Sequence, residues 1–417
     1  MKSVIVSPLS QPIKASIALA ASKSESNRAL IIHALTGFGC DLTNLAAARD
    51  TQTMLRLLQS SEAVADVLDA GTTMRFLTAY FAITNQTKTM TGTPRMCERP
   101  IGILVEALRK LGADIEYADK EGFPPLHIKG FRASGQARLA IRGDVSSQYI
   151  SALLMIAPLL PAGLTLELTG EIGSRPYIEM TLQQMIYFGA EIQTDWTQKT
   201  ITVAAKPYQP KSYAIESDWS GASYWYSLVA MSADEHTEIE LLGLKQNSLQ
   251  GDSAIAKIME SLGVKSRFTE HGVVLTKQPA QKSLAWDFTD CPDLAQTVAV
   301  CCAVKQIELT LTGIESLKIK ETDRVAALQA ELPKIGGQLL EVVSGLKYEV
   351  SNHKSQITNH KSQISPVETY DDHRMAMAFA PVGVVRAIEI AEPHVVAKSY
   401  PSFWEDLAQV CAVETVG

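Results

Sequence analysis

The chain has no surplus of positive charge. Of its 417 residues, 38 are Lys or Arg and 45 are Asp or Glu, which gives a formal net charge of -7. A nucleic-acid-binding protein usually carries a basic surplus, so we expect no nucleic-acid partner. Hydrophobic residues make up 46% and charged residues 20%, as in ordinary folded proteins. Any anionic ligand must therefore be bound by local clusters of cationic side chains.

Cysteine is scarce, and its spacing argues against a metal or redox motif. No two cysteines form a C-x-x-C pair, and the eight histidines show no metal-ligand spacing either. We therefore predict no metal and no cofactor, and we expect buried free thiols in a reducing cytosol. The six cysteines are Cys40, Cys97, Cys291, Cys301, Cys302 and Cys411.

The sequence also lacks an apolar run that is typical of a signal peptide or a membrane span. Polar residues and prolines interrupt the apolar residues of segment 1–22. The longest apolar stretch, YISALLMIAPLLPAGLTL, contains Pro158 and Pro161, which predicts a buried helix followed by a turn. We therefore expect a cytoplasmic protein with no membrane partner.

A weak internal repeat runs along the chain. Four amphipathic helical patterns each end in a glycine, namely Gly112, Gly189, Gly263 and Gly336, and these glycines are about 75 residues apart. Each glycine is predicted to end its helix in the left-handed conformation. The spacing favours a supersecondary unit that is used several times, although helix–glycine–strand junctions are common enough to arise at such intervals by chance.

A second set of helical patterns alternates with the first. These helices begin at polar residues and are apolar on most sides, which predicts that they are buried. One buried helix, one half-exposed helix and several strands in each unit favour an α/β or α+β fold with helices packed inside sheets. The six segments are 22–35, 69–81, 145–155, 217–231, 291–304 and 371–384.

One polar segment does not follow the repeat. Residues 352–364 read NHKSQITNHKSQI, a tandem that we interpret as a duplicated surface hairpin or loop. Its two histidines, His353 and His360, would be conceivable metal ligands. Their spacing inside a polar duplication favours chance instead.

Lys and Arg gather at the starts of the apolar helices. Ser22 and Glu25 have the spacing of a capping box, which predicts a helix start. Ser24 and Arg28 share a helix face, and Lys23 lies beside the free N–H groups of the first turn. This arrangement favours a phosphate or carboxylate site, but by itself it would fit a capped helix with surface charges equally well.

Similar clusters recur at other helix starts, and their number is the stronger signal. Gly71 precedes a helix start, where it lets backbone approach a ligand closely. Pro100, which follows Arg95 and Arg99, is predicted to be the first residue of another helix. Arginines together with Ser and Gln donors suit a ligand that has several anionic groups and hydroxyls. The remaining clusters are Ser146–Gln148, Ser174–Tyr177, Lys320–Arg324, Asp371–Arg374 and Lys398.

Carboxylates lie in or beside these cationic clusters at Asp293, Glu321 and Asp372. A protein that only binds anions would gain nothing from them, because they repel the ligand. Proton transfer would explain them, and so would ion pairs that orient the arginines. For Asp323 and Asp371 we favour the ion-pair explanation.

Taken together, these motifs resemble the 5-enolpyruvylshikimate-3-phosphate synthases, or 3-phosphoshikimate 1-carboxyvinyltransferases. The resemblance extends from about Lys23 to Lys398. It implies two similar domains, each made of three βαβαββ units in an inverse α/β barrel with a six-fold internal repeat, and an active site in the cleft between the domains. Residues 1–21 and 217–417 would form one discontinuous domain, and residues 22–216 an inserted one. The matching motifs are SKSESNRAL, DAGTTMRF, PRMCERPIG, SSQYISALLM, SRPYIEMT, DFTDCPDLAQT, KIKETDR, TYDDHRMAMAF and AKSYPSFWEDL.

The resemblance implies that the enolpyruvyl group of phosphoenolpyruvate is transferred to the 5-hydroxyl of shikimate 3-phosphate, without a metal, by a monomer. This reaction belongs to the route to chorismate and the aromatic amino acids. The implied catalytic residues are Asp293 as base, Glu321 as acid and Lys23. Shikimate 3-phosphate would be bound by Lys23, Ser24, Arg28, Ser146, Ser147, Gln148, Ser174, Asp293 and Lys320. Phosphoenolpyruvate would be bound by Lys23, Gly71, Arg99, Gln148, Arg324, Arg374 and Lys398.

The resemblance also implies competition between glyphosate and phosphoenolpyruvate, with room for the inhibitor at Gly71. Phe76 stands where some members have Pro, so it bears on that sensitivity. The nearest rival is the related transferase that acts on UDP-N-acetylglucosamine. Its reactive cysteine lies five residues before an Arg-Pro, where this chain has Pro94, and Cys97 lies only two residues before Arg99. A non-catalytic anion sensor on the same fold is the second alternative.

Overall fold

The computed structural model describes residues 2–10, 12–352 and 365–417. The NHKSQI tandem after residue 352, with both of its histidines, lies outside these residues. The chain forms two compact units. Unit 1 comprises Met1–Ser22 and Glu216–Gly417, and unit 2 comprises Lys23–Ile215. These limits differ by one residue at each crossing from the division expected from the sequence.

The chain crosses between the units twice, at neighbouring positions. Ala21 and Ser217 form an isolated antiparallel bridge. The amide of Ser22 donates a hydrogen bond to the carbonyl of Glu216 over 2.8 Å. The first residue of unit 2, Lys23, therefore follows directly on a hydrogen-bonded pair of segments.

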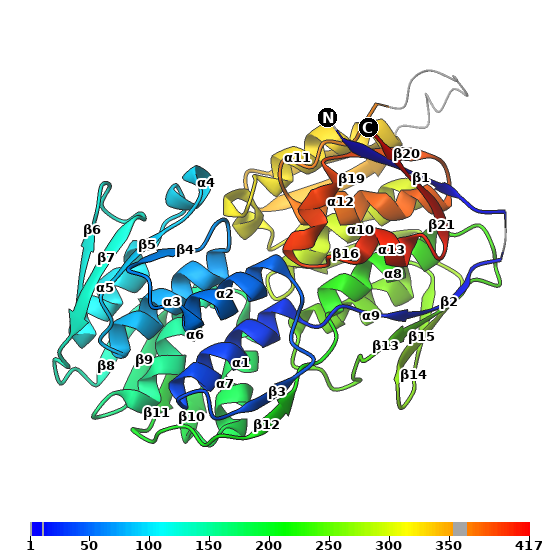
Figure 1. The fold of residues 1–417 in the computed structure, drawn as a ribbon. Helices are drawn as coiled ribbons and strands as arrows, with labels where there is room; N and C mark the ends of the chain where they lie inside the picture. Colours follow the sequence, from blue (N-terminus) through cyan, green and yellow to red (C-terminus); the bar gives the residue numbers. More distant parts are fainter. Residues whose placement is uncertain (1, 11, 353–364) are drawn as a thin grey trace. The chain divides into compact units, whose positions relative to one another are not determined.

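Unit 2 contains two four-stranded sheets and a two-stranded one in the part of the chain described here (Figure 1). The first sheet has the order β4 (Val64–Asp66), β5 (Lys88–Thr91), β7 (Leu126–Phe131), β6 (Ala113–Tyr117), and the second the order β10 (Ile192–Asp195), β11 (Thr200–Val203), β9 (Leu164–Thr169), β8 (Arg138–Arg142). The two-stranded sheet pairs β12 (Ser212–Ala214) with β3 (Asp41–Thr43). The helices are α1 (Lys23–Leu35), α2 (Arg49–Gln59), α3 (Gly71–Ile83), α4 (Pro94–Cys97), α5 (Gly102–Leu111), α6 (Ser147–Ile156), η1 (Ala157–Leu159) and α7 (Arg175–Tyr187).

Unit 1 likewise has two four-stranded sheets in its described residues, together with a three-stranded one. Their orders are β14 (Val264–Phe268), β15 (Gly272–Lys277), β13 (Glu238–Leu242), β2 (Lys14–Ala18); β16 (Ser283–Asp287), β17 (Glu308–Thr312), β19 (Lys347–Asn352), β18 (Gly337–Val343); and β20 (Ile388–Ala391), β1 (Ser3–Pro8), β21 (Cys411–Val416). The helices are α8 (Trp219–Met231), η2 (Gly251–Ala254), α9 (Ile255–Ser261), η3 (Pro292–Leu294), α10 (Ala295–Lys305), η4 (Glu315–Ile319), α11 (Arg324–Glu331), η5 (Leu332–Ile335), α12 (His373–Phe379), η6 (Ala380–Val384), η7 (Pro393–Lys398) and α13 (Phe403–Leu407).

All the four-stranded sheets share one topology. In the first sheet of unit 2, β4 is parallel to β5, β5 is antiparallel to β7, and β6 and β7 form an antiparallel hairpin. Helix α3 lies between the first two strands in the chain, and α5 precedes the hairpin. The sheets of β8, β2 and β16 repeat this pairing. This confirms the predicted βαβαββ unit.

The remaining two sheets depart from the expected set of six equal units. In the three-stranded sheet, β1 from the N-terminus pairs antiparallel with both β20 and β21 and so replaces the last strand of the unit. The two-stranded sheet keeps only the parallel pair β12 and β3. The repeat is therefore interrupted where the chain begins and where it crosses between the units.

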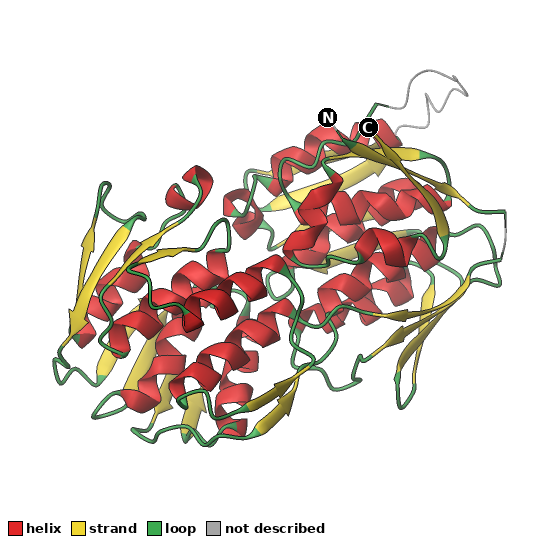
Figure 2. Ribbon diagram, in the orientation of Figure 1, coloured by secondary structure: helices red, strands yellow, loops and turns green. Residues whose placement is uncertain are grey.

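The helices lie inside each unit and the sheets surround them (Figure 2). All 13 positions of α8 are buried, as its apolar sequence predicts. In β8 and β13, burial alternates along the strand, so one sheet face packs on helices and the other faces solvent. The four repeat glycines have φ between 88° and 117°, which confirms the left-handed helix ends.

Two local predictions were wrong. Pro100 does not begin a helix, because the amides of Ile101 and Gly102 both bond to the carbonyl of Gly122, and α5 begins only at Gly102. Pro94 begins the short helix α4 instead, after Thr93, whose Oγ1 accepts a bond from the amide of Met96. Second, Cys97 in this short helix is half-buried, whereas the other five cysteines are buried free thiols as predicted.

Candidate active site

A buried arginine organises the charged cluster of unit 1. Arg324 is the first residue of α11 and is 1% exposed. It donates hydrogen bonds to Asp293 Oδ1 (2.9 Å), Glu321 Oε2 (2.9 Å) and Asp372 Oδ2 (2.7 Å). Burial alone would lower the pKa of Arg324, but the three carboxylates outweigh burial and raise it. Arg324 therefore carries a permanent charge that holds three acids together.

Asp293 is surrounded by cations. It lies in η3, where Arg374 Nη2 donates to its Oδ2 over 2.8 Å and Lys320 Nζ lies 3.5 Å from its Oδ1. Burial opposes ionisation of Asp293, but Arg374, Lys320 and Arg324 together hold its pKa well below the usual range. In this arrangement Asp293 is an ionised carboxylate and a weak base.

Glu321 lies on the other side of Arg324 and contacts a second cation. Its Oε1 lies 3.5 Å from Nζ of Lys398, a lysine of η7 that is 2% exposed. The six predicted site residues of this unit therefore form one contiguous network of ion pairs. They are Asp293, Lys320, Glu321, Arg324, Arg374 and Lys398.

The remaining acids of these motifs have structural roles. Asp372 is fully buried, binds Arg324, and accepts the amide of Arg374 at the start of α12. Asp323 caps α11 by accepting the amide of Ala326, so the predicted ion pair of this residue was wrong. Asp371 forms no ion pair with any described residue, so that prediction was wrong too. At Asp323 the carboxylate lies at a helix start, where the backbone amide of Ala326 competes with side-chain cations.

In unit 2 the predicted residues lie at or near the starts of α1, α3, α6 and α7, except for Arg99, which lies between α4 and α5. Lys23 opens α1, and its Nζ lies 3.2 Å from Oδ2 of Asp50 in α2. Asp50 is 2% exposed, and its second oxygen has no hydrogen-bond partner among the described residues. Sequence reasoning missed Asp50, although an acid in the first turn of a helix is a recognisable signal.

Arg28 is the most deeply buried cation of this group, at 2% exposure. Its Nε donates to Oγ1 of Thr181 over 2.7 Å, and its Nη groups donate to Ser151 Oγ and to the carbonyls of Ser24 and Tyr177. Burial lowers the pKa of Arg28 to about 10, although Tyr177 and Glu25 oppose the decrease. Neutral groups, not carboxylates, thus bind this guanidinium.

Gly71 and Arg99 are close neighbours in the same unit. A Cβ atom at Gly71 would lie 2.6 Å from Nη1 of Arg99, so only glycine leaves space for this guanidinium. Gln148 Nε2 donates to Oγ1 of Thr72, the next residue along, over 3.0 Å. The start of α3 therefore contacts two residues that come from different motifs.

The predicted serines occupy helix starts. Ser146 caps α6, where its Oγ accepts the amide of Gln148 over 3.4 Å, and Ser147 is the first residue of that helix. Ser174 precedes α7 in the left-handed conformation, at φ 52°. These positions leave helix N-terminal amides beside serine hydroxyls, an arrangement that suits a phosphate.

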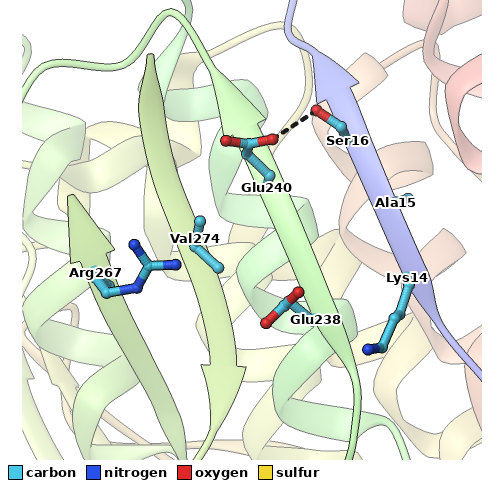
Figure 3. A pocket seen from close by; sticks show the side chains of 7 residues that line it. All are labelled: Lys14, Ala15, Ser16, Glu238, Glu240, Arg267 and Val274. Carbon is cyan, nitrogen blue, oxygen red and sulfur yellow. Dashed lines mark hydrogen bonds between the residues drawn. The ribbon is translucent and has the colours of Figure 1, made fainter. Parts of the chain in front are cut away.

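A hollow of about 440 Å³ lies elsewhere, on the outer face of the sheet that contains β2 and β13 (Figure 3). Ser16 donates to Glu240 across it over 3.0 Å. None of the predicted residues lines it, so we do not assign the site there. Its lining residues are Lys14, Ala15, Ser16, Glu238, Glu240, Arg267 and Val274.

Within residues 2–10, 12–352 and 365–417, no three His, Cys, Asp or Glu side chains are grouped so that they could hold a metal ion. Among the helices described, none has the length and apolar character needed to cross a membrane.

Known proteins share both the sequence and the fold. A family model described as EPSP synthase (3-phosphoshikimate 1-carboxyvinyltransferase) matches residues 9–62 and 57–407. A 3-phosphoshikimate 1-carboxyvinyltransferase of Bacteroides fragilis is 51% identical over 398 residues, and the match covers 95% of each chain. One from Cellvibrio japonicus is 36% identical, covering 95% of this chain and 97% of its own length.

The fold agrees as well. The structure of EPSP synthase from Acinetobacter baumannii superposes with a TM-score of 0.77 at 18% identity, and the match covers 100% of both chains. This likeness confirms the predicted two-domain α/β fold. By sequence and by fold, the chain belongs to the EPSP synthase (3-phosphoshikimate 1-carboxyvinyltransferase) family.

Proposed function

We propose that this protein transfers the enolpyruvyl group of phosphoenolpyruvate to the 5-hydroxyl of shikimate 3-phosphate and releases phosphate. One observation of the structure carries the proposal: a single buried guanidinium, that of Arg324, binds the carboxylates of both Asp293 and Glu321 at 2.9 Å. The reaction needs an acid and a base that act on adjacent atoms. The curated relatives, which bear the name of this activity over 95% of the chain, support the same substrates.

Glu321 is the proposed acid, in the protonated state that it takes when the anionic groups of phosphoenolpyruvate draw Arg324 and Lys398 away from it. It gives its proton to the methylene carbon of phosphoenolpyruvate, which leaves the neighbouring carbon cation-like. The 5-hydroxyl oxygen then bonds to that carbon, and Asp293 takes the hydroxyl proton. When the carbon–oxygen bond to phosphate breaks, the departing phosphate takes this proton, and a methyl proton returns to Glu321. Both acids therefore end in their starting states, and no further reactant is needed.

The ion pairs of Asp293 suggest how the base is activated. In the described arrangement Arg374, Lys320 and Arg324 stabilise its charge, so it has little affinity for a proton. The substrates carry phosphate and carboxylate groups that compete for the same cations. Their binding draws positive charge away from Asp293 and raises its pKa, so the base gains strength only when the substrates are present.

The residues of unit 2 are proposed to bind and orient the substrates. Lys23 contacts both substrates and is the third catalytic residue, with Ser24, Arg28, Ser146, Ser147, Gln148 and Ser174 on shikimate 3-phosphate. Gly71, Arg99 and Gln148 act on phosphoenolpyruvate together with Arg324, Arg374 and Lys398, and Lys320 contacts the shikimate side. The proposed active site thus combines residues of both units. Charged hydrogen bonds of about 1.5–3 kcal/mol each provide the positioning.

The proposed function is tested by phosphate release from phosphoenolpyruvate. We expect release with shikimate 3-phosphate and none with UDP-N-acetylglucosamine as the acceptor. Release with the sugar nucleotide instead would assign the protein to the rival activity. Tight binding of both proposed substrates without any release would favour the anion sensor.

We also propose that the protein acts as a monomer in the cytoplasm, without nucleic-acid or membrane partners. The net charge of -7 supports the absence of a nucleic-acid partner. Light scattering after size-exclusion chromatography tests the oligomeric state, with 45.3 kDa as the expected mass.

A further inference from the structure

Asp252 is a buried carboxylate that the proposed mechanism does not use. It lies in η2 and is 3% exposed. Its Oδ2 accepts a hydrogen bond from the hydroxyl of Ser220, and its Oδ1 has no hydrogen-bond partner among the described residues. A buried, unpaired carboxylate oxygen costs about 1–3 kcal/mol, so the presence of Asp252 calls for a physical reason.

Ser220 connects this carboxylate to the charged cluster. Ser220 lies in the first turn of α8, and Arg374 Nη2 donates to its Oγ over 3.4 Å. The same Nη2 atom donates to Oδ2 of Asp293 over 2.8 Å. Because the single proton of Ser220 is donated to Asp252, an oxygen lone pair is left to face Arg374. Asp252 thus fixes the orientation in which Ser220 accepts a bond.

The charges around this pair are arranged to pull Arg374 in two directions. Asp293 attracts its guanidinium from η3, and Asp252 attracts it from η2 through Ser220. The electrostatic interactions of Asp252 include those with Asp293 and Asp218, which oppose its ionisation, and with Arg374, which favours it. Without Asp252, Arg374 would be drawn mainly towards the base and would neutralise it further.

We infer that Ser220 and Asp252 position the Arg374 guanidinium for phosphoenolpyruvate. This inference rests on the proposed function, which assigns Arg374 to that substrate. Both residues are positioning residues, since neither needs to contact a substrate. Without Ser220 or Asp252, Arg374 stays charged but is less well placed. The binding of phosphoenolpyruvate should therefore weaken, while the binding of shikimate 3-phosphate should not change.

The test compares Ser220→Ala, Asp252→Asn and the double variant, with KM measured for each substrate and kcat measured separately. We expect each single variant to raise KM for phosphoenolpyruvate about tenfold, as for the loss of one charged hydrogen bond. KM for shikimate 3-phosphate should change less than twofold. The double variant should be no worse than the poorer single variant, because Ser220→Ala removes the hydroxyl and Asp252→Asn removes the charge of the same connection.

Two matched variants control for packing. Ser227→Ala removes another fully buried hydroxyl from the same helix and should leave both KM values unchanged. Ser220→Thr keeps the hydroxyl and should retain a wild-type KM. Unchanged KM values in Ser220→Ala and Asp252→Asn would overturn the inference. So would multiplied effects in the double variant, or equal increases for both substrates.

A crystal structure of the Ser220→Ala variant separates this inference from the proposed function. If the wild-type protein turns over neither substrate, the proposed function fails, but the positioning of Arg374 is still observable. We expect the Arg374 guanidinium to shift towards Asp293 or to occupy more than one conformation. A side chain that keeps its wild-type position would overturn the inference whatever the activity.

Discussion

The most buried arginines of the two clusters, Arg324 in unit 1 and Arg28 in unit 2, are held in opposite ways. In unit 1, Arg324 is bound by three carboxylates, and Asp293 by three cations. In unit 2, Arg28 is equally buried, but it is bound by hydroxyls and carbonyls and lies beside the rings of Phe76 and Tyr177. A cation that is already paired with acids has its charge neutralised, whereas one held by neutral groups keeps charge available for an anion.

This difference assigns proton transfer to unit 1, whose cations are also proposed to bind phosphoenolpyruvate, and leaves the binding of shikimate 3-phosphate mainly to unit 2. Proton transfer needs carboxylates whose pKa values respond to nearby charge, and unit 1 supplies them. Positioning of phosphates needs cations and helix amides, and unit 2 supplies these at the starts of α1, α6 and α7. Lys23 at the start of α1 is paired with Asp50, whereas Arg28 one turn further on is held by neutral groups. The following predictions test the contrast in order of expected size.

The largest expected effect is on turnover in the Glu321→Gln variant. The amide keeps an acceptor for Arg324 but has no proton to give, so we expect kcat to fall by about 10²–10⁴. Dissociation constants for both substrates, measured by calorimetry, should stay within a few-fold of wild type. Near-normal turnover would show that Glu321 is not the acid and that its cluster has no role in the chemical step.

Stability should distinguish the two buried arginines. Removal of the guanidinium in Arg324→Ala leaves Asp293, Glu321 and Asp372 without their shared counter-ion, and we expect a loss of about 3–5 kcal/mol in the free energy of unfolding. Arg28→Ala leaves only neutral acceptors behind and should cost about 1–3 kcal/mol. Urea unfolding monitored by circular dichroism measures both. Equal losses would mean that the contrast between the units has no energetic basis.

The features of the fold and of the candidate site that can be predicted from the sequence are those that depend on residues close together in the chain. The repeat of about 75 residues, the buried α8 and the cluster members came from local patterns, while the βαβαββ order of the unit was implied by the family resemblance. The pairing of β1 with β20 did not, because it joins Ser3 to Ala391. Likewise Ser220 and Arg374 are 154 positions apart and share no motif, so only the fold brings them together.

A further prediction concerns pH, because the carboxylates of unit 1 are not equivalent. Burial, together with Asp293, raises the pKa of Asp252 to about 6 from an ordinary 3.8, although Arg374 opposes the shift. Between these values the folded protein binds more protons than the unfolded chain, so this group makes stability fall as pH rises from about 4 to about 6. The Asp252→Asn variant has no carboxyl group at this position, so it should not show this loss of stability.

The free energy of unfolding of the Asp252→Asn variant should therefore increase relative to that of the wild type as pH rises through this range. The gain is at most about 3 kcal/mol at pH 7 and is close to zero at pH 4. Urea unfolding of both proteins at matched pH values measures the difference. A difference that does not change between pH 4 and pH 7 would show that Asp252 titrates normally.

The smallest expected effect lies in unit 2, at Gly71. In Gly71→Ala the new methyl group would lie 2.6 Å from Nη1 of Arg99, so the guanidinium must move. We expect KM for phosphoenolpyruvate to rise about tenfold, while kcat changes little because the acids of unit 1 are untouched. Glyphosate, which we expect to compete with phosphoenolpyruvate in the wild type, should inhibit this variant more weakly. If Gly71→Ala instead lowered kcat and left KM unchanged, Gly71 would act in the chemical step, and its assignment to phosphoenolpyruvate binding would be wrong.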